Sequence, residues 1–191
     1  MDKREIRKAL LAPDSPAGFT ACVTALLREG PVGPEILLIV RREHDGDPWS
    51  GQVALPGGKA HAGEKAQEAA AREVWEEVGL DLRKCASVLG CLPTRAPANR
   101  PEMAVVPFVA VMEQPLTPPY LGEEIAAAVW APLPALLGNA ATARRRIRDQ
   151  ERSFPAFAYR ELLVWGLTYQ ILLELAAVLD MPYAKPSIDS K

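Results

Sequence analysis

Three glutamates stand close together near the middle of the chain, at a spacing that a helix would bring to one face. Glu73, Glu76 and Glu77 lie in the segment 72–80, which reads Arg-Glu-Val-Trp-Glu-Glu-Val-Gly-Leu. At about 100° per residue, the three carboxylates fall within one sector of a helix. The opposite side collects the apolar residues Ala71, Val74, Trp75 and Val78. We therefore expect a helix with one packed face and one face of concentrated negative charge.

Such a charge cluster predicts a bound cation. Like charges at i, i+3 and i+4 repel, so the helix loses stability unless something neutralises them. Carboxylates without Cys or His suit a hard divalent ion such as Mg²⁺ or Mn²⁺, which commonly bridges to phosphate oxygens. Arg72 could hold one carboxylate by a charge-assisted hydrogen bond. The Gly57-Gly58 pair would let the backbone approach an ion or a phosphate closely.

The segment from Gly58 to Leu80 resembles the signature of the Nudix hydrolases. That signature is a Gly, five residues, a Glu, seven residues, and then Arg-Glu-apolar-any-Glu-Glu-any-Gly-apolar. All nine specified positions over these 23 residues are matched, with Glu64 as the first Glu. So many positions are a specific signal, unlike a lone glycine motif. The resemblance implies an α/β fold, a Nudix-like α/β/α sandwich with a mixed sheet, and the apolar C-terminal segment adds a helix to it.

The same resemblance implies a metal-dependent pyrophosphohydrolase. In such an enzyme water attacks one phosphorus of a diphosphate, Mg²⁺ or Mn²⁺ neutralises the bridging oxygens, and a Glu accepts the proton. Carried over by position, the principal metal ligands are Glu73 and Glu77, and Glu76 is a shared ligand or the base. Arg72 would orient Glu73, and the Gly58 carbonyl would complete the coordination.

Two further roles stay open. The general base varies among Nudix-like enzymes and can lie outside the signature, so Glu123 and Glu124 are alternative candidates. Glu64 precedes the helix, so the angular argument does not place it with the cluster. It would fix the signature loop, act as an outer metal ligand, or take a direct part in the reaction.

The residues before the signature resemble the motif of one branch of the family, the coenzyme A pyrophosphatases. Arg42, Gly51 and Pro56-Gly57-Gly58 match in register, and the segment 154–168 is also similar to this branch. Asp47 stands where the motif has a second Arg, and Leu55 where it has Phe. An Asp cannot pair with a phosphate as an Arg would. The match nevertheless makes coenzyme A or a derivative the leading substrate, with phosphopantetheine and 3′,5′-ADP as products.

Other functions fit the same helix. Nucleoside di- or triphosphates, dinucleoside polyphosphates, ADP-ribose and nucleotide sugars are alternative substrates. A different class is a non-catalytic, nucleotide-binding regulatory module that keeps the fold without turnover. The intact pairs Arg72-Glu73 and Glu76-Glu77 favour the enzyme, because a module without chemistry has no reason to keep a costly charge cluster.

Basic residues outside the signature could contact phosphates. Arg42 is one candidate, and Arg95 and Arg100 lie in the expected loop 93–101. The cluster 144–148 with Arg152 could hold a remote phosphate, although a solvated surface is the simpler interpretation. No aromatic residues interleave with this cluster, which disfavours single-stranded nucleic acid as a partner.

The pattern of apolar residues and turn residues predicts the remaining elements. Strands are expected at 19–27, 36–41, 86–92 and 103–112, with a turn at 29–34 and an exposed loop at 43–48 that leads to residues 52–55. Helices are expected at 5–11, around the glutamates, at 125–129 and at 160–179.

Length and composition agree with one domain. The 191 residues suit a single core at about 18–140, an extension at 141–180 packed on it, and a flexible tail at 183–191. A net charge of -2, from 22 basic and 24 acidic residues, produces no field that would recruit nucleic acid or membrane. Three cysteines without disulfide or metal-ligand spacing suggest free thiols in a reducing compartment, so we expect a cytoplasmic protein. A homodimer remains open from the resemblance alone.

Overall fold

The computed structural model describes residues 1–13, 18–43, 51–114, 116–147 and 150–186. Its helices are α1 (Lys3–Lys8), α2 (Ala66–Val78), α3 (Leu82–Cys85), α4 (Leu133–Leu137) and α5 (Gly166–Val178). Its strands are β1 (Ala21–Gly30), β2 (Gly33–Arg41), β3 (Val53–Ala54), β4 (Gly57–Lys59), β5 (Ala86–Cys91), β6 (Val105–Met112), β7 (Ile125–Pro132), β8 (Ala140–Ile147), β9 (Gln150–Tyr159) and β10 (Leu162–Trp165).

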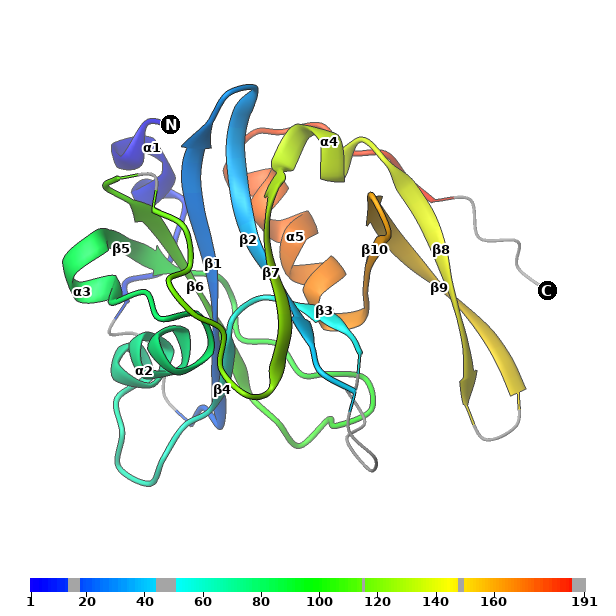
Figure 1. Ribbon diagram of the computed structural model, residues 1–191, viewed down its shortest axis with the longest axis horizontal. Helices are drawn as coiled ribbons and strands as arrows, with labels where there is room; N and C mark the ends of the chain where they lie inside the picture. The colour runs from blue at the N-terminus through cyan, green and yellow to red at the C-terminus, as the bar shows by residue number, and fades with distance from the viewer. Residues whose placement is uncertain (14–17, 44–50, 115, 148–149, 187–191) are drawn as a thin grey trace.

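A mixed sheet of seven strands forms the centre of the molecule (Figure 1). The order is β3-β2-β1-β6-β5, with β4 pairing β1 and β7 pairing β2. β1 and β6 run parallel, whereas β1 pairs with β2 and β4 in antiparallel fashion. The α/β fold with a mixed sheet and a C-terminal helix is therefore confirmed.

The two faces of this sheet are covered by different elements. Alternate residues of β2 point to opposite sides, as in any strand. Leu37 and Ile39 pack with Val74 and Val78 of α2, whereas Ile36 and Leu38 belong to a core that includes residues of α4, α5 and β9. Small residues on α2 (Ala66, Ala69 and Ala70) are buried against Cys22 and Phe108 and let the helix lie close to the sheet.

A second sheet lies on the α5 side. Its three strands have the order β10-β9-β8, and its inner end contributes Phe157 and Val164 to the main core. The far end of the β8–β9 hairpin extends away from the rest of the molecule (Figure 1). Tyr183, at the start of the expected flexible tail, packs edge-on against Phe157, and the Ala184 N–H donates to the Leu137 carbonyl.

The expected helix at 125–129 is wrong, because Ile125–Pro132 is strand β7. It pairs antiparallel with β2, from Glu35↔Pro132 to Arg41↔Ile125. The alanine-rich sequence has no strong local preference for a strand. The segment forms a strand because it pairs with the edge of β2, whose N–H and C=O groups would otherwise lack sheet partners.

Two other expected elements differ from the structure in their bounds. The apolar run at 160–179 is a strand followed by a helix: Leu162–Trp165 pairs with Ala156–Tyr159 across a turn in which Arg160 has a φ of 53°. A short continuous apolar run is compatible with either state. The first hairpin is tighter than the predicted turn at 29–34, because Gly30 pairs with Gly33 and only Pro31 and Val32 connect the strands.

Within the described ranges, no helix is long and apolar enough to span a membrane.

Candidate active site

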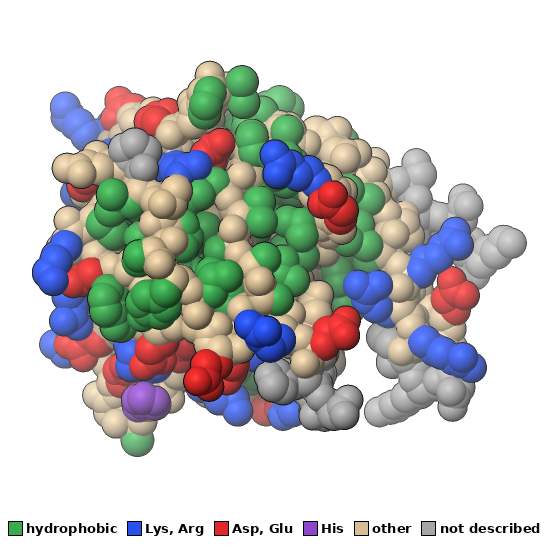
Figure 2. Space-filling model, in the orientation of Figure 1, with side chains coloured by type: hydrophobic (Ala, Val, Ile, Leu, Met, Phe, Trp, Pro, Cys, Tyr) green, Lys and Arg blue, Asp and Glu red, His purple; other side chains and the backbone are tan. Residues whose placement is uncertain are grey.

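The glutamates lie on α2, and the helix presents them differently from one another. Val74 and Val78 are fully buried under the helix, as predicted. Trp75 is 50% exposed, so its expected place on the packed face is wrong. The Glu77 side chain, which was expected on the charged face, is instead buried beside β4. Figure 2 shows acidic side chains gathered on the surface over α2 and β4.

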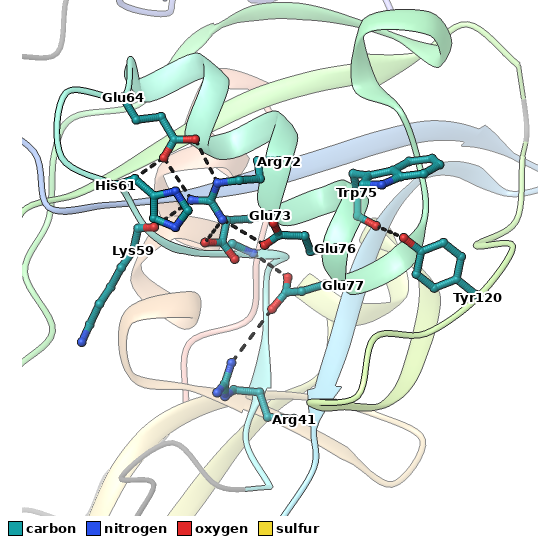
Figure 3. A network of polar contacts seen from close by, with 11 residues as sticks. Arg41, Lys59, His61, Glu64, Arg72, Glu73, Trp75, Glu76, Glu77 and Tyr120 are labelled. Carbon is teal, nitrogen blue, oxygen red and sulfur yellow. Dashed lines mark hydrogen bonds and ion pairs between the residues drawn. The ribbon is translucent and has the colours of Figure 1, made fainter.

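Arg72 joins three carboxylates (Figure 3). Its Nη1 donates to Glu73 Oε1 at 2.8 Å and to Glu76 Oε2 at 2.9 Å. Its Nε and Nη2 donate to the two oxygens of Glu64 at 2.9 and 3.0 Å, and Nη2 also donates to the Lys59 carbonyl at 2.9 Å. The planar guanidinium thus makes five hydrogen bonds from three nitrogens, whereas the single nitrogen of a Lys has only three N–H groups. The expected contact between Arg72 and Glu73 is present.

Glu64 fixes the signature loop. Besides the two bonds from Arg72, it accepts the His61 backbone N–H at 2.9 Å. The hydrogen bond from Arg72 lowers the pKa of Glu64 to about 2. Among the roles left open for Glu64, this geometry favours the one that holds the loop, because both carboxylate oxygens already have donors.

Glu77 and Glu73 face the backbone of β4. The Gly57 N–H donates to Glu77 Oε2 at 2.8 Å. A Cβ at Gly58 would lie 2.5 Å from Glu73 Oε2, so only glycine permits this approach. The predicted proximity of Gly58 to the acidic cluster is therefore found, and any larger residue there would displace the Glu73 carboxylate.

Burial disfavours the charged form of the Glu73 and Glu77 carboxylates. Desolvation, together with the negative charge of nearby Glu73, raises the pKa of Glu77 to about 8. Desolvation also raises the pKa of Glu73, against the lowering effect of Arg72. In the described ranges, no three His, Cys, Asp or Glu side chains already form a metal-binding group. The donor set fits a hard divalent cation in its chemistry, since it offers carboxylates and a backbone carbonyl.

The buried Glu77 predicts how the metal-free protein responds to pH. The folded state holds a proton on Glu77 up to about pH 8, whereas the ordinary value for this group is 4.5. Folding therefore retains a proton that the unfolded chain releases, and stability falls as pH rises from about 4.5 to 8, by up to a few kcal/mol. We expect thermal unfolding in chelator to show this fall, and E77Q to remove most of it.

The matched control for this measurement is E68Q, at an exposed position of the first turn of α2. It should retain the pH dependence of the wild type. An equal fall in E77Q and wild-type protein would contradict the assignment to Glu77.

Arg41 and Glu124 form a part of the site that the sequence did not single out as a pair. Arg41 Nη2 donates to Glu124 Oε2 at 3.0 Å, and Nη1 lies 4.0 Å from Glu77 Oε1 (Figure 3 shows the Glu77 contact). Glu124, a predicted alternative base, is thus brought to the edge of the cluster. Glu123 is exposed. No local signal joined Arg41 to Glu124, because the pairing of β2 with β7 brings these two residues together.

The arginines predicted to bind substrate have protein partners. Arg42 Nε donates to the Glu123 carbonyl at 2.8 Å and Nη2 to the Ile125 carbonyl at 3.1 Å. Arg95 pairs with Glu174 of α5, and Arg100 Nη1 lies 3.5 Å from Glu102 Oε1. Each of these three arginines thus has a protein partner in the structure, and its contact with a substrate phosphate stays a prediction.

The arginine cluster lies on the β8–β9 hairpin, where basic side chains dominate the projecting end (Figure 2). Arg145 stacks over the Trp165 ring at 5.1 Å, and Arg144 and Arg152 are exposed. This agrees with the interpretation as a solvated surface. Arg148 and the loop residues 44–50, including Asp47, lie outside the described residues.

Comparison with known proteins agrees with this geometry. A family model described as the NUDIX domain matches residues 18–151. The chain is 29% identical over 178 residues to Nudix hydrolase 15, mitochondrial, of Arabidopsis thaliana, covering 87% of this chain and 60% of that protein. It is 38% identical over 79 residues to an ADP-ribose pyrophosphatase of Methanocaldococcus jannaschii, covering 41% of this chain and 43% of the relative.

A third relative is an uncharacterised protein of Schizosaccharomyces pombe, 35% identical over 133 residues, which are 65% of this chain and 40% of the relative. The chain thus spans between 40% and 60% of the length of these three relatives.

Two solved structures share the fold. A MutT/nudix family protein from Enterococcus faecalis has a TM-score of 0.52 at 21% identity, covering 88% of this chain and 64% of that one. A C. elegans Ap4A hydrolase complex also has a TM-score of 0.52, at 20% identity, covering 84% of this chain and 96% of that one. At these identities the likeness establishes the fold alone.

Proposed function

We propose that this chain, which belongs to the Nudix family, hydrolyses the diphosphate linkage of a nucleotide derivative. The observation that carries the proposal is the gathering of Glu64, Glu73 and Glu76 on Arg72, with Glu77 buried next to them. Repulsion among these carboxylates is only partly relieved by one guanidinium. A divalent cation would complete the charge balance and could in turn bind the phosphate oxygens of a substrate.

Each residue of the cluster has a task in this proposal. Glu73, Glu76 and Glu77, with the Gly58 carbonyl, would hold Mg²⁺ or Mn²⁺, and enzymes of the family typically use divalent metals. The cation supplies charge neutralisation at the diphosphate oxygens and a lower pKa for bound water. Arg72 orients Glu73 and Glu76. Glu76 or Glu124 accepts the proton of the attacking water; both side chains are more than half exposed, which lets them face a substrate.

For the substrate we propose coenzyme A or one of its derivatives, cleaved to phosphopantetheine and 3′,5′-ADP. The support is the register of Arg42, Gly51 and Pro56-Gly57-Gly58, together with segment 154–168. Because Arg42 holds backbone carbonyls, its place in the motif would reflect shaping of the site and not direct contact with a phosphate. ADP-ribose is the second candidate, since the relative from M. jannaschii is named an ADP-ribose pyrophosphatase.

A substrate panel tests both candidates. Coenzyme A, acetyl-coenzyme A, ADP-ribose, nucleoside di- and triphosphates, dinucleoside polyphosphates and a nucleotide sugar are incubated with Mg²⁺ or Mn²⁺, and products are identified by mass. We expect phosphopantetheine and 3′,5′-ADP from coenzyme A, with one oxygen from heavy-oxygen water in a product phosphate.

E76Q serves as the inactive control for the panel, and chelator should stop turnover by the wild type. Turnover of ADP-ribose with none of coenzyme A would replace the leading substrate by the second. No turnover of any compound, with tight binding of one of them, would favour the regulatory module.

A further inference from the structure

The segment between β6 and β7 lies against the C-terminal turn of α2. The Tyr120 hydroxyl donates to the Trp75 carbonyl at 2.6 Å, and the two rings meet edge to face, with centroids 5.9 Å apart and an interplanar angle of 89° (Figure 3). Two residues further on, the Gly122 N–H donates to the Glu77 carbonyl at 2.9 Å. The segment is therefore hydrogen-bonded to the same helical turn that carries Glu76 and Glu77.

Two glycines allow the close approach of this segment and the end of α2. A Cβ at Gly122 would lie 2.5 Å from the Glu76 carbonyl oxygen, and a Cβ at Gly79 would lie 2.6 Å from the Tyr120 ring. Such distances leave no space for a side chain at either position. The Tyr120 segment and the end of α2 therefore touch without intervening groups, and a shift of one must move the other.

The other end of the same segment is held by β2. The Arg42 backbone N–H donates to the Glu124 carbonyl at 2.7 Å, while the Arg42 side chain reaches the carbonyls of Glu123 and Ile125. Arg41 holds the Glu124 carboxylate at 3.0 Å. Residues 120–125 thus bridge α2 and β2, and this bridge sets the place of Glu124 relative to Glu77.

We propose that Tyr120 is a positioning residue. Its hydrogen bond to the Trp75 carbonyl fixes residues 120–125 against α2 and so holds Glu124 in the position needed for turnover. The inference rests on the proposed function, since it needs a reaction at the acidic cluster. Core packing alone does not account for Tyr120: its side chain is 43% exposed and its ring partner Trp75 is 50% exposed. Its specific contribution is the hydroxyl contact with a carbonyl on the catalytic helix.

Kinetics of Y120F and E124Q test the assignment with the best substrate of the panel. E124Q should lower kcat by about 10²-fold. Y120F removes one hydrogen bond and keeps the ring, so kcat should fall about fivefold, with KM and the half-saturating Mg²⁺ concentration unchanged. If Tyr120 acts through Glu124, Y120F in the E124Q background should cause no further loss, since the two effects are then not additive.

The matched control is Y183F. Tyr183 is also partly exposed, at 39%, and packs edge-on against an aromatic ring, but that ring is Phe157 on the α5 side. Y183F should leave kcat unchanged. The assignment is overturned if Y120F keeps wild-type kcat, if its effect appears in KM, if E124Q keeps full activity, or if the two losses multiply.

The proposed function has its own readout in this experiment. Turnover by the wild type and its loss in E76Q would uphold the hydrolase even where Tyr120 has no kinetic effect. Absence of turnover in the wild type would overturn both.

Discussion

Replacing Glu76 with Gln is expected to lower metal-dependent turnover by about 10²- to 10⁴-fold, the range for loss of a general base or an equivalent charge. The Gln side chain has nearly the same shape, and its oxygen can still accept from Arg72, which contacts Glu76 at 2.9 Å. The Glu76 side chain is 53% exposed, so the fold should not depend on its charge. Steady-state rates over a range of Mg²⁺ and Mn²⁺ concentrations measure the effect.

The metal titration separates the two tasks proposed for Glu76. A base would lower kcat at every metal concentration, whereas a ligand would shift the half-saturating concentration upward. E68Q, an exposed glutamate on the same helix, is the control and should turn over at the wild-type rate. Unchanged turnover in E76Q would contradict the mechanism proposed for this site.

Replacing Arg72 with Ala should damage both the fold and the reaction. Arg72, Glu64 and Glu73 are mostly buried, with side-chain exposures of 21%, 14% and 15%. Removing one partner from buried charges leaves the others uncompensated, which costs about 3 kcal/mol. For a chain of this size, that corresponds to a decrease in Tm of about 6–12 °C. Loss of the group that orients two carboxylates should lower activity by a further 10- to 100-fold.

R72K distinguishes geometry from charge. Lysine restores one positive charge but cannot reach several acceptors in the plane of a guanidinium, so R72K should recover part of the Tm and little of the activity. R83A, at an exposed position of α3, is the control for removal of an arginine and should leave both quantities unchanged. A Tm for R72A equal to that of the wild type would show that the carboxylates do not depend on Arg72.

Helical periodicity was sufficient to predict α2 and its charge cluster. Residues 66–78 combine good helix formers with a buried apolar stripe, so the local preference and the tertiary packing agree there. The same periodicity placed Trp75 wrongly. Angular position indicates which residues share a face of the helix, but it does not show what that face contacts. Trp75 lies at the surface, where its ring packs against Tyr120 in the segment that covers the end of α2.

Where the local sequence contains no strong signal, pairing with a neighbouring strand determined the secondary structure. Ile125–Pro132 became a strand because β2 offered an edge, and Leu162–Trp165 became a strand because β9 offered another. In neither segment does the local sequence alone select a strand over a helix. Hydrogen bonds to residues more than eighty positions away in the first case outweigh the weak helical tendency of an alanine-rich run.

The sequence by itself therefore predicted the acidic helix, a cation to neutralise it and the resemblance to Nudix hydrolases, because all three depend on residue types at short, regular spacing. Only the tertiary structure decided which carboxylate is buried, that Arg42 holds backbone, and that Arg41 and Glu124 join the site. Those outcomes depend on β4 lying under Glu77 and on β7 pairing with β2. Contacts between distant segments follow from strand pairing and burial, which local spacing does not contain.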